Sequence, residues 1–180
     1  MSNDLELQII VERAKACDPE ALALIYERYF DRIYRYILAR VRHRETAEDL
    51  AGQTFLRLIE RIADFKWRGP GFTSWLFRIA HNLVIDWYRR QREVPFLESR
   101  AGVAAGTEET VFAAESLREA LQAVGKLKEK QRQVLLLRLV AGLSGRETAE
   151  VLDLSEVNVR AIQHRALVAL REKLRVKINA

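Results

Sequence analysis

Two sets of side chains in this sequence could bind a polyanion. The first follows a Gly/Pro loop between residues 65 and 93, where three- and four-residue steps would place these residues on one helix face: Arg78, His81, Asn82, Ile85 and Arg89. The second set has the same spacing near the C-terminus and comprises Arg160, Ala161, His164 and Arg165. Asparagine and arginine can hydrogen-bond base edges, and arginine also neutralises phosphate, so both sets favour nucleic-acid binding.

Residues that could carry out catalysis are sparse. The three histidines lie far apart in the sequence, which contains no Gly-rich phosphate loop, nucleophile elbow or HExxH pattern. Glu48 and Asp49 are adjacent, but neighbouring side chains on a helix diverge by about 100° and do not form a catalytic pair. The single cysteine, Cys17, excludes an internal disulfide and a multi-cysteine metal site. We therefore expect no enzymatic activity, no cofactor and no metal site.

The charges of the chain are distributed in three blocks. Residues 1–92 carry 16 basic against 13 acidic side chains, residues 93–115 carry 1 against 5, and residues 116–180 carry 13 against 7. Two basic blocks therefore flank an acidic connector. This arrangement suits two contacts with a polyanion, joined by a tether that does not itself bind it.

The composition is that of a globular protein, with 49% hydrophobic and 31% charged residues in 180. No apolar run approaches the roughly 18 residues of a membrane-spanning helix. The first residues, MSNDLELQ, lack the basic start and apolar middle of a signal peptide. We therefore expect a cytoplasmic protein with no membrane insertion.

The N-terminal block is predicted to form consecutive helices. Asp18 and Pro19 are typical of an N-cap and a first helical residue, and apolar residues then recur at helical spacing to about residue 42. Thr46 and Asp49 resemble a capping box that starts a second helix, which runs to about Ile62. The expected core positions of the two helices are Leu22, Ile25, Tyr29, Ile33, Tyr36, Leu50, Phe55, Leu58, Ile59 and Ile62.

A third helix follows the loop RGPG at residues 68–71, where Pro70 and two glycines interrupt helical structure. We expect Thr73 or Ser74 to cap this helix. One face should pack onto the preceding helices through Trp75, Leu76, Ile79, Leu83, Val84 and Trp87. The simplest interpretation of the two tryptophans is that they anchor the helix in the core and do not stack on bases.

Residues 93–113 lose the helical periodicity and are predicted to be a linker. Two further helices are expected at 117–127 and from 129 to the stop at Gly142. Ser144 and Glu147 then form a capping box for a short helix ending at Leu152. Ser155 should cap the last helix, whose expected buried residues are Val159, Ile162, Ala166, Leu170 and Leu174. The predicted fold is all-α, with two small helical domains (1–92 and 114–180) joined by a flexible linker.

The short helix, the turn and the last helix together form a predicted helix-turn-helix, in which the second helix enters the major groove of DNA. Ala149 lies where the two helices must approach closely, which favours a small side chain. The polar set of the last helix lies near its N-terminal half, the part that reaches bases. A solvent-exposed basic helix in a bundle would show the same pattern, so this motif alone leaves that alternative open.

Taken in order, the segments resemble bacterial sigma factors of the extracytoplasmic-function (ECF) class. AEDLAGQTFLRLIERI is similar to the helix that, in that family, docks on the clamp of core RNA polymerase. FTSWLFRIAHNLVIDWYRR and the preceding loop resemble the part that recognises and opens the −10 promoter element. KEKQRQVLLLRLVAGLSGRETAEVLDLSEVNVRAIQHRALVALREKL is similar to the family's second domain, which reads the −35 element. The resemblance covers nearly the whole chain outside the linker.

The resemblance implies roles for residues at matching positions. The polymerase-facing side of the docking helix would carry Asp49, Gln53 and Arg57. The −10 strand, with a flipped base in a loop-lined pocket, would meet Lys66, Trp67, Arg68, Arg78, Asn82 and Arg89. The −35 element would meet Arg160, Ala161, His164 and Arg165, with Asn158 near the phosphate backbone. Ala161 offers only a methyl group, which suits contact with a thymine.

Four positions depart from the family's usual pattern. Gly52 and Gln53 stand where the family often has glutamine and glutamate, Lys128 replaces a proline, and Asp153 replaces the glycine of the helix-turn-helix turn. A glycine weakens a helix by roughly 1 kcal/mol. Aspartate tolerates a left-handed backbone better than most residues, so we expect the turn to be kept.

The leading hypothesis is thus a dissociable initiation subunit that binds core RNA polymerase and promoter DNA. Because a free sigma factor must be restrained, the resemblance also suggests an anti-sigma factor as a partner. One alternative is a dimeric helix-turn-helix regulator that binds duplex DNA without polymerase. A DNA-processing enzyme would need a carboxylate or metal cluster, and the sequence does not display one.

Overall fold

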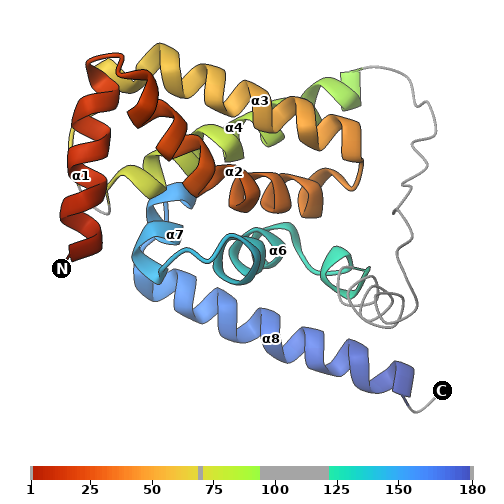
Figure 1. The fold of residues 1–180 in the computed structure, drawn as a ribbon. Helices are drawn as coiled ribbons and strands as arrows, with labels where there is room; N and C mark the ends of the chain where they lie inside the picture. The colour runs from red at the N-terminus through yellow and green to blue at the C-terminus, as the bar shows by residue number, and fades with distance from the viewer. Residues whose placement is uncertain (1, 69–70, 94–121, 179–180) are drawn as a thin grey trace, which may run out of the picture.

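The computed structural model describes residues 2–68, 71–93 and 122–178, and in these ranges the chain folds into helices and turns without a strand (Figure 1). The all-α prediction is therefore confirmed. The predicted linker lies outside the described residues, except for its first residue, Glu93, which ends a helix. The same is true of the first part of the helix expected at 117–127, of which residues 122–125 are seen as helix.

The N-terminal domain begins with a helical hairpin of α1 (Ser2–Lys15) and α2 (Pro19–Val41). As predicted, Asp18 caps α2, because its Oδ1 accepts hydrogen bonds from the backbone N–H groups of Glu20 (3.0 Å) and Ala21 (3.4 Å). At the other end Arg42 takes a left-handed conformation with φ 58° and donates its N–H to the carbonyl of Leu38. α2 therefore ends one residue before the predicted position.

The start of α3 (Arg44–Arg61) differs from the prediction. Its N-cap is His43, whose Nδ1 accepts a hydrogen bond from the backbone N–H of Thr46 at 3.3 Å. Thr46 lies inside the helix, so the expected capping box with Asp49 is wrong. The reason is that an imidazole nitrogen can replace the usual hydroxyl or carboxylate oxygen as the acceptor. A short 3-10 turn, η1 (Ile62–Asp64), follows α3.

The last helix of this domain, α4 (Phe72–Glu93), starts earlier than expected. Thr73 and Ser74 are therefore its second and third residues, and neither is the N-cap. Instead the Ser74 hydroxyl donates a hydrogen bond to the carbonyl of Gly71 at 2.9 Å. The predicted apolar face is confirmed, with Leu76, Leu83 and Val84 buried and Trp75, Ile79 and Trp87 packed at the edge of the core.

The C-terminal domain contains α6 (Glu129–Leu135), the π-helical turn η2 (Leu136–Val140), α7 (Gly145–Leu152) and α8 (Glu156–Ile178). The predicted stop at Gly142 is confirmed, since this residue has φ +68°. Ser144 and Glu147 form the expected capping box through hydrogen bonds of 2.7 and 3.1 Å. Ser155 Oγ accepts from the backbone N–H of Asn158 at 3.2 Å, which starts α8.

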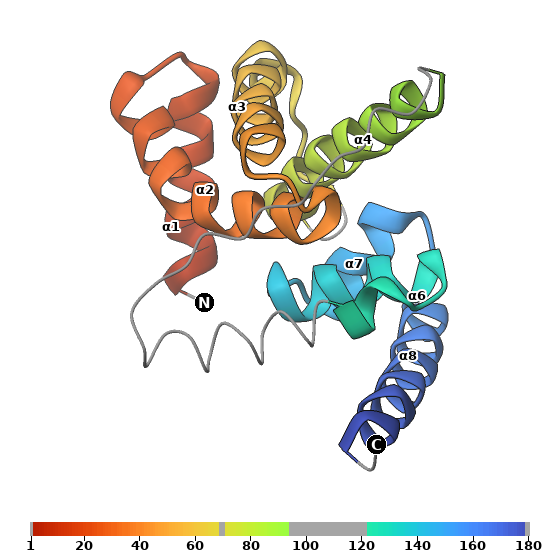
Figure 2. The same cartoon turned by 90° about the vertical axis from the view of Figure 1, so that its right-hand side faces the viewer.

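The two domains pack against each other, which the sequence analysis did not predict. α7 lies against α4, and η2 lies against α2, whereas α8 lies on the far side of α6 and α7 (Figure 2). One hydrophobic core runs through this contact. It joins the buried residues of α1–α4 to Leu136, Leu137, Ala141, Leu143 and Val151 of the C-terminal domain.

Candidate nucleic-acid and partner interfaces

The loop before α4 presents an aromatic side chain between two cations. Lys66 and Arg68 are exposed, and Trp67 between them keeps 36% of its surface accessible. The indole Nε1–H of Trp67 donates a hydrogen bond to Glu12 Oε1 of α1 at 2.9 Å. Its ring packs edge-on against Phe65, with 5.1 Å between the ring centroids. Helix α1 and the core therefore fix the position of Trp67.

The base of the loop is an aromatic cluster. Phe65 is buried and contacts Phe72 and Trp75, at centroid distances of 5.4 and 5.1 Å. Gly71 closes the loop with φ +87°, a conformation that L side chains rarely adopt. Trp75 and Trp87 are packed against the core, in agreement with the sequence interpretation, but Trp67 is exposed and offers a face for stacking.

The polar face of α4 is partly open and partly occupied. Asn82 and Arg89 are exposed, and Arg89 lies 3.2 Å from Asp86 one turn earlier. Arg78, by contrast, reaches the C-terminal domain. Its Nη2 donates to the backbone carbonyl of Glu150 in α7 and lies 3.2 Å from the carboxylate of the same residue. The domain contact thus engages the guanidinium of Arg78, although 42% of its side chain stays exposed.

His81 does not belong to the exposed set, which corrects the sequence prediction. It is 8% exposed, and its Nδ1 lies 2.8 Å from the hydroxyl of Tyr36 in α2. Burial, together with the nearby cation of Arg40, lowers the pKa of His81 from 6.5 to about 4. The side chain is therefore a neutral, structural link between α2 and α4. Spacing along α4 could not reveal this, because the burial depends on a partner 45 residues away.

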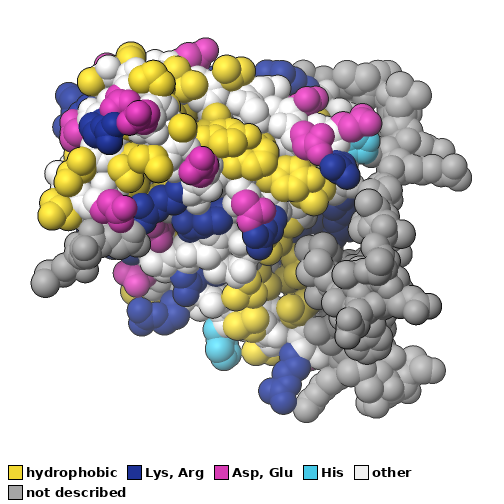
Figure 3. Space-filling view, viewed as in Figure 1, with side chains coloured by type: hydrophobic (Ala, Val, Ile, Leu, Met, Phe, Trp, Pro, Cys, Tyr) yellow, Lys and Arg dark blue, Asp and Glu magenta, His cyan; other side chains and the backbone are white. Residues whose placement is uncertain are grey.

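The three residues predicted on the docking helix are all exposed. Asp49, Gln53 and Arg57 follow four-residue steps along one face of α3. Two large apolar side chains, Leu56 and Ile59, are also exposed on this helix, so the prediction of Ile59 as a core residue is wrong. Figure 3 shows hydrophobic side chains gathered over the surface of α2 and α3. This face combines charge with apolar surface, as protein-binding surfaces do.

An aromatic row beside that face was missed by the sequence analysis. Tyr26, Phe30 and Tyr34 lie at four-residue steps on α2, and their neighbouring rings stack with centroid distances of 4.8 and 6.1 Å. Phe55 of α3 packs against Tyr26 at 4.8 Å. The four-residue spacing was the signal that could have found it. Tyr29 and Tyr36, the tyrosines predicted for the core, are fully buried on the other side of this helix.

The predicted set on α8 is exposed in full. The residues concerned are Asn158, Arg160, Ala161, His164 and Arg165. The Nε of Arg165 donates to the carbonyl of Ala161 at 3.3 Å, and Arg160 lies 3.8 Å from Glu156, so both arginines stay near the first turns of α8. The opposite side of the helix is buried through Val159 and Ala166.

The turn between α7 and α8 has the geometry of a helix-turn-helix. Asp153 ends α7 with φ 53° and ψ 52°, so the expected left-handed residue is present without a glycine. Ala149 is buried and shares a small core with Val134 of α6 and Val159 of α8. A larger side chain at Ala149 would push these helices apart, as the sequence analysis anticipated.

In the part of the chain that the structure describes, no group of three or more His, Cys, Asp or Glu residues is placed to hold a metal ion. No helix within the described ranges is long and apolar enough to cross a membrane. The exposed polar sets on α3, α4 and α8 are the features that could carry function.

The sequence matches two known domain families in the order predicted. Residues 25–94 match sigma-70 region 2, and residues 117–170 match sigma-70 region 4. The first match includes the loop and both candidate faces of the N-terminal domain, on α3 and α4. The second match includes the helix-turn-helix.

Several curated relatives resemble the chain over most of its length. The ECF RNA polymerase sigma factor BldN of Streptomyces coelicolor is 37% identical, with 96% of this chain and 67% of BldN covered. The RNA polymerase sigma factor YlaC of Bacillus subtilis is 33% identical, with 83% and 90% covered. The ECF RNA polymerase sigma factor SigD of Mycobacterium tuberculosis is 34% identical, with 93% and 84% covered.

Solved structures share the fold. CnrH, in a complex with the cytosolic domain of CnrY, matches with a TM-score of 0.75 and 25% identity, covering 93% of this chain and 96% of CnrH. The sigma factor RpoE of Bartonella quintana, in a complex with the anti-sigma factor NepR, matches in fold with a TM-score of 0.69 at 23% identity, covering 86% and 96%. With both domain families matched, the chain belongs to the extracytoplasmic-function class of bacterial RNA polymerase sigma factors.

Proposed function

We propose that this sigma factor binds core RNA polymerase through the exposed face of α3 and then contacts promoter DNA through the α4 loop and α8. One observation carries the proposal: Asp49, Gln53 and Arg57 are exposed together on a region 2 helix, beside apolar side chains. An interface of this composition can bury apolar area at its centre and orient the partner through charges at its rim.

The −10 strand would bind at the loop and the open part of α4. Trp67 offers a stacking surface, while Lys66 and Arg68 on either side can neutralise phosphates. Asn82 and Arg89 would extend the contact along α4. A flipped base costs a few kcal/mol to unstack, which a positioned polar and aromatic pocket can repay. Strand opening then follows from binding the opened strand better than the duplex, so the chain acts without enzymatic chemistry and without a cofactor.

The −35 element would bind α8 in its major groove. Arg160, His164 and Arg165 project from the first half of the helix, where a recognition helix approaches base edges. Ala161 would contact a thymine methyl group, and Asn158 a backbone phosphate. The buried opposite side of α8 keeps this orientation fixed relative to α7.

Membership of this family also supports two further proposals, one on the cellular location of the chain and one on a protein that regulates it. A subunit of RNA polymerase acts in the cytoplasm, and we place the chain there. CnrH and RpoE were solved with the cytosolic domain of CnrY and with the anti-sigma factor NepR, respectively. By analogy, we infer that an anti-sigma factor restrains this chain.

The test is co-elution of the purified chain with core RNA polymerase in size-exclusion chromatography without DNA. Arg57→Glu should abolish co-elution, because it reverses a charge on the proposed docking face. Arg165→Ala serves as the control, since it removes a cation from α8 and should co-elute like the wild type. A wild-type chain that stays separate from polymerase, and binds duplex DNA as a dimer, would instead establish the regulator hypothesis.

A further inference from the structure

Arginines of the N-terminal domain face oxygen atoms of the C-terminal domain throughout the domain contact. Arg32 of α2 donates its Nε–H to the carbonyl of Ala141 at 3.0 Å. Arg78 of α4 meets the carbonyl and carboxylate of Glu150. Arg40 of α2 lies 2.8 Å from the carboxylate of Glu129. At these three points the C-terminal domain offers oxygen acceptors to arginines, as a nucleic-acid backbone would, beside the apolar core that joins the domains.

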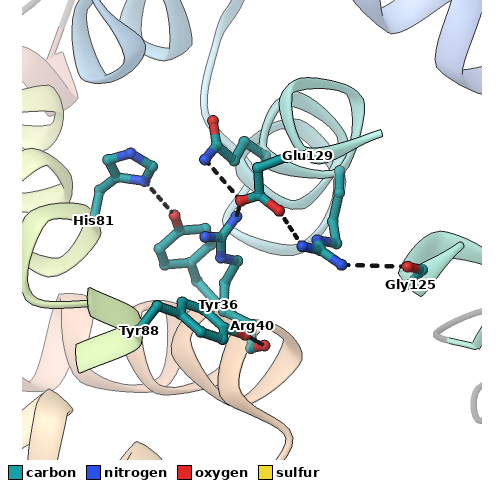
Figure 4. Close-up of polar contacts among 8 residues, drawn as sticks. Tyr36, Arg40, His81, Tyr88, Gly125 and Glu129 are labelled. Atoms are coloured by element: carbon teal, nitrogen blue, oxygen red, sulfur yellow. Dashed lines mark hydrogen bonds and ion pairs between the residues drawn. The ribbon is translucent and has the colours of Figure 1, made fainter. Parts of the chain in front are cut away.

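Arg40 is the most deeply buried of these cations, at 4% exposure. Figure 4 shows its guanidinium between the Tyr88 ring, 5.7 Å from the centroid, and Glu129. Although Nη1 is close to Glu129 Oε1, none of the three guanidinium nitrogens makes a hydrogen bond of good geometry. The buried guanidinium of Arg40 has five N–H donors but makes one ion pair, so most of these donors have no hydrogen-bond acceptor.

Two side chains of its own domain hold the Glu129 carboxylate in position for the contact with Arg40. Gln133 Nε2 donates to its Oε1 at 2.8 Å, and Arg132 pairs with its Oε2 (Figure 4). Arg132 in turn donates to the carbonyl of Gly125 at 3.2 Å. Burial alone would raise the pKa of Glu129, but Arg40 and Arg132 hold it below its usual value. The carboxylate is therefore an oriented anion at the first turn of α6.

We propose that Arg40 is a phosphate-binding site for the opened promoter strand, and that Glu129 occupies this site in the closed arrangement of the two domains. The inference rests on the proposed function and adds a binding residue to it. A guanidinium binds carboxylate and phosphate with the same planar fork, so one anion can replace the other. Arg40 lies beside His81 and Tyr88 of α4, the helix that carries Arg78 and Asn82.

Separation of the domains would expose both cations together. Arg40 would lose Glu129, Arg78 would lose Glu150, and the strand along α4 would gain two phosphate contacts. Only the open form binds DNA at this face. The apparent association constant for DNA therefore equals the intrinsic constant multiplied by the fraction of chains in the open form. Glu129 is then an intramolecular competitor of DNA.

The experiment compares Glu129→Gln with Arg40→Gln in the full chain. Both changes break the ion pair, but only the first keeps the cation. The readouts are the radius of gyration of the free chain in solution scattering, and the Kd for a fluorescent single-stranded oligodeoxynucleotide of mixed sequence. Glu20→Gln is the matched control, because Glu20 is also a first-turn glutamate paired with an arginine, Arg13, but within one domain.

For Glu129→Gln we expect a larger radius of gyration and about tenfold tighter binding of the oligonucleotide. The slope of log Kd against log salt should steepen by about 1.4, the value for two added phosphate contacts on a single strand. Arg40→Gln should enlarge the chain but tighten binding less than Glu129→Gln, because it releases Arg78 alone. Glu20→Gln should change neither readout.

Equal tightening in both variants would overturn the proposal, because Arg40 would then be only a link between domains. An unchanged radius and Kd in Glu129→Gln would overturn it as well. If Arg40→Gln fails to fold, the salt slope of Glu129→Gln still decides. None of these readouts uses polymerase, so a failure of the proposed docking function would appear separately, in the co-elution test.

Discussion

Acidification should destabilise the folded chain through His81. Burial raises the pKa of Tyr36, so its hydroxyl stays protonated, and it lies at hydrogen-bond distance, 2.8 Å, from His81 Nδ1. A neutral imidazole with its proton on Nε2 can accept this hydrogen bond at Nδ1. Protonation would place a second cation in a buried site beside Arg40, which already makes an imperfect ion pair.

The size of the effect follows from the shifted pKa of His81. Its pKa falls from 6.5 to about 4 on folding, so the unfolded chain binds the proton first as the pH drops. The stability is complete above pH 6.5 and is lost as the pH falls from 6.5 towards 4. At 1.36 kcal/mol per pKa unit, the loss is about 2 kcal/mol at pH 5 and about 3 kcal/mol below pH 4.

The assay is urea unfolding followed by circular dichroism at pH 7.5, 6 and about 5, where most carboxylates remain ionised. His81→Gln keeps a side-chain acceptor for Tyr36 but does not titrate, so it should lose about 2 kcal/mol less than the wild type at pH 5. His164→Gln is the control, because His164 is exposed on α8 and its replacement should leave the pH dependence unchanged. Parallel pH profiles for the wild type and His81→Gln would refute the reasoning.

Three further outcomes are expected. Ser144→Ala should remove the cap of α7 and reduce the free energy of unfolding by about 1 kcal/mol in urea titrations. Ala149→Leu should overpack the contact with Val159, costing about 1–3 kcal/mol and weakening duplex binding in gel-shift assays. Arg165→Ala should weaken promoter binding by about 1–3 kcal/mol and leave co-elution with polymerase unchanged; loss of co-elution would contradict the role assigned to α8.

Features that depend on neighbouring residues could be predicted from the sequence. Asp18 and the Ser144–Glu147 pair cap their helices as expected, because a cap is a contact across at most one turn. The left-handed Asp153 was anticipated for the same reason. The exposed set on α8 also followed from spacing, since burying Val159 and Ala166 leaves the opposite side to solvent.

Features that depend on distant residues could not be predicted this way. One local feature was also missed: the N-cap of α3 is His43, whose imidazole reaches Thr46 three residues on, and histidine is not among the preferred N-cap residues. His81 shares the spacing of Arg78 and Asn82, yet a tyrosine on another helix draws it into the core. Arg78 keeps its predicted place on α4, but its partner Glu150 comes from the other domain.

The domain contact joins two blocks of like net charge. Both blocks carry a net positive charge, which predicts mutual repulsion at long range. At the contact itself, however, Glu129 and Glu150 lie about 3 Å from arginines, and pairwise energies at that distance exceed those between screened, distant charges.

Apolar burial also stabilises the contact between the domains, and salt does not screen this contribution. Leu136 and Leu137 are almost fully buried in the core that joins both domains, and separating the domains would expose part of this surface. DNA binding, by contrast, depends on counterion release and weakens steeply with salt. Rising ionic strength should therefore weaken the DNA-bound state more than the closed one, because the closed arrangement relies mainly on its apolar contacts and only secondarily on Glu129 and Glu150.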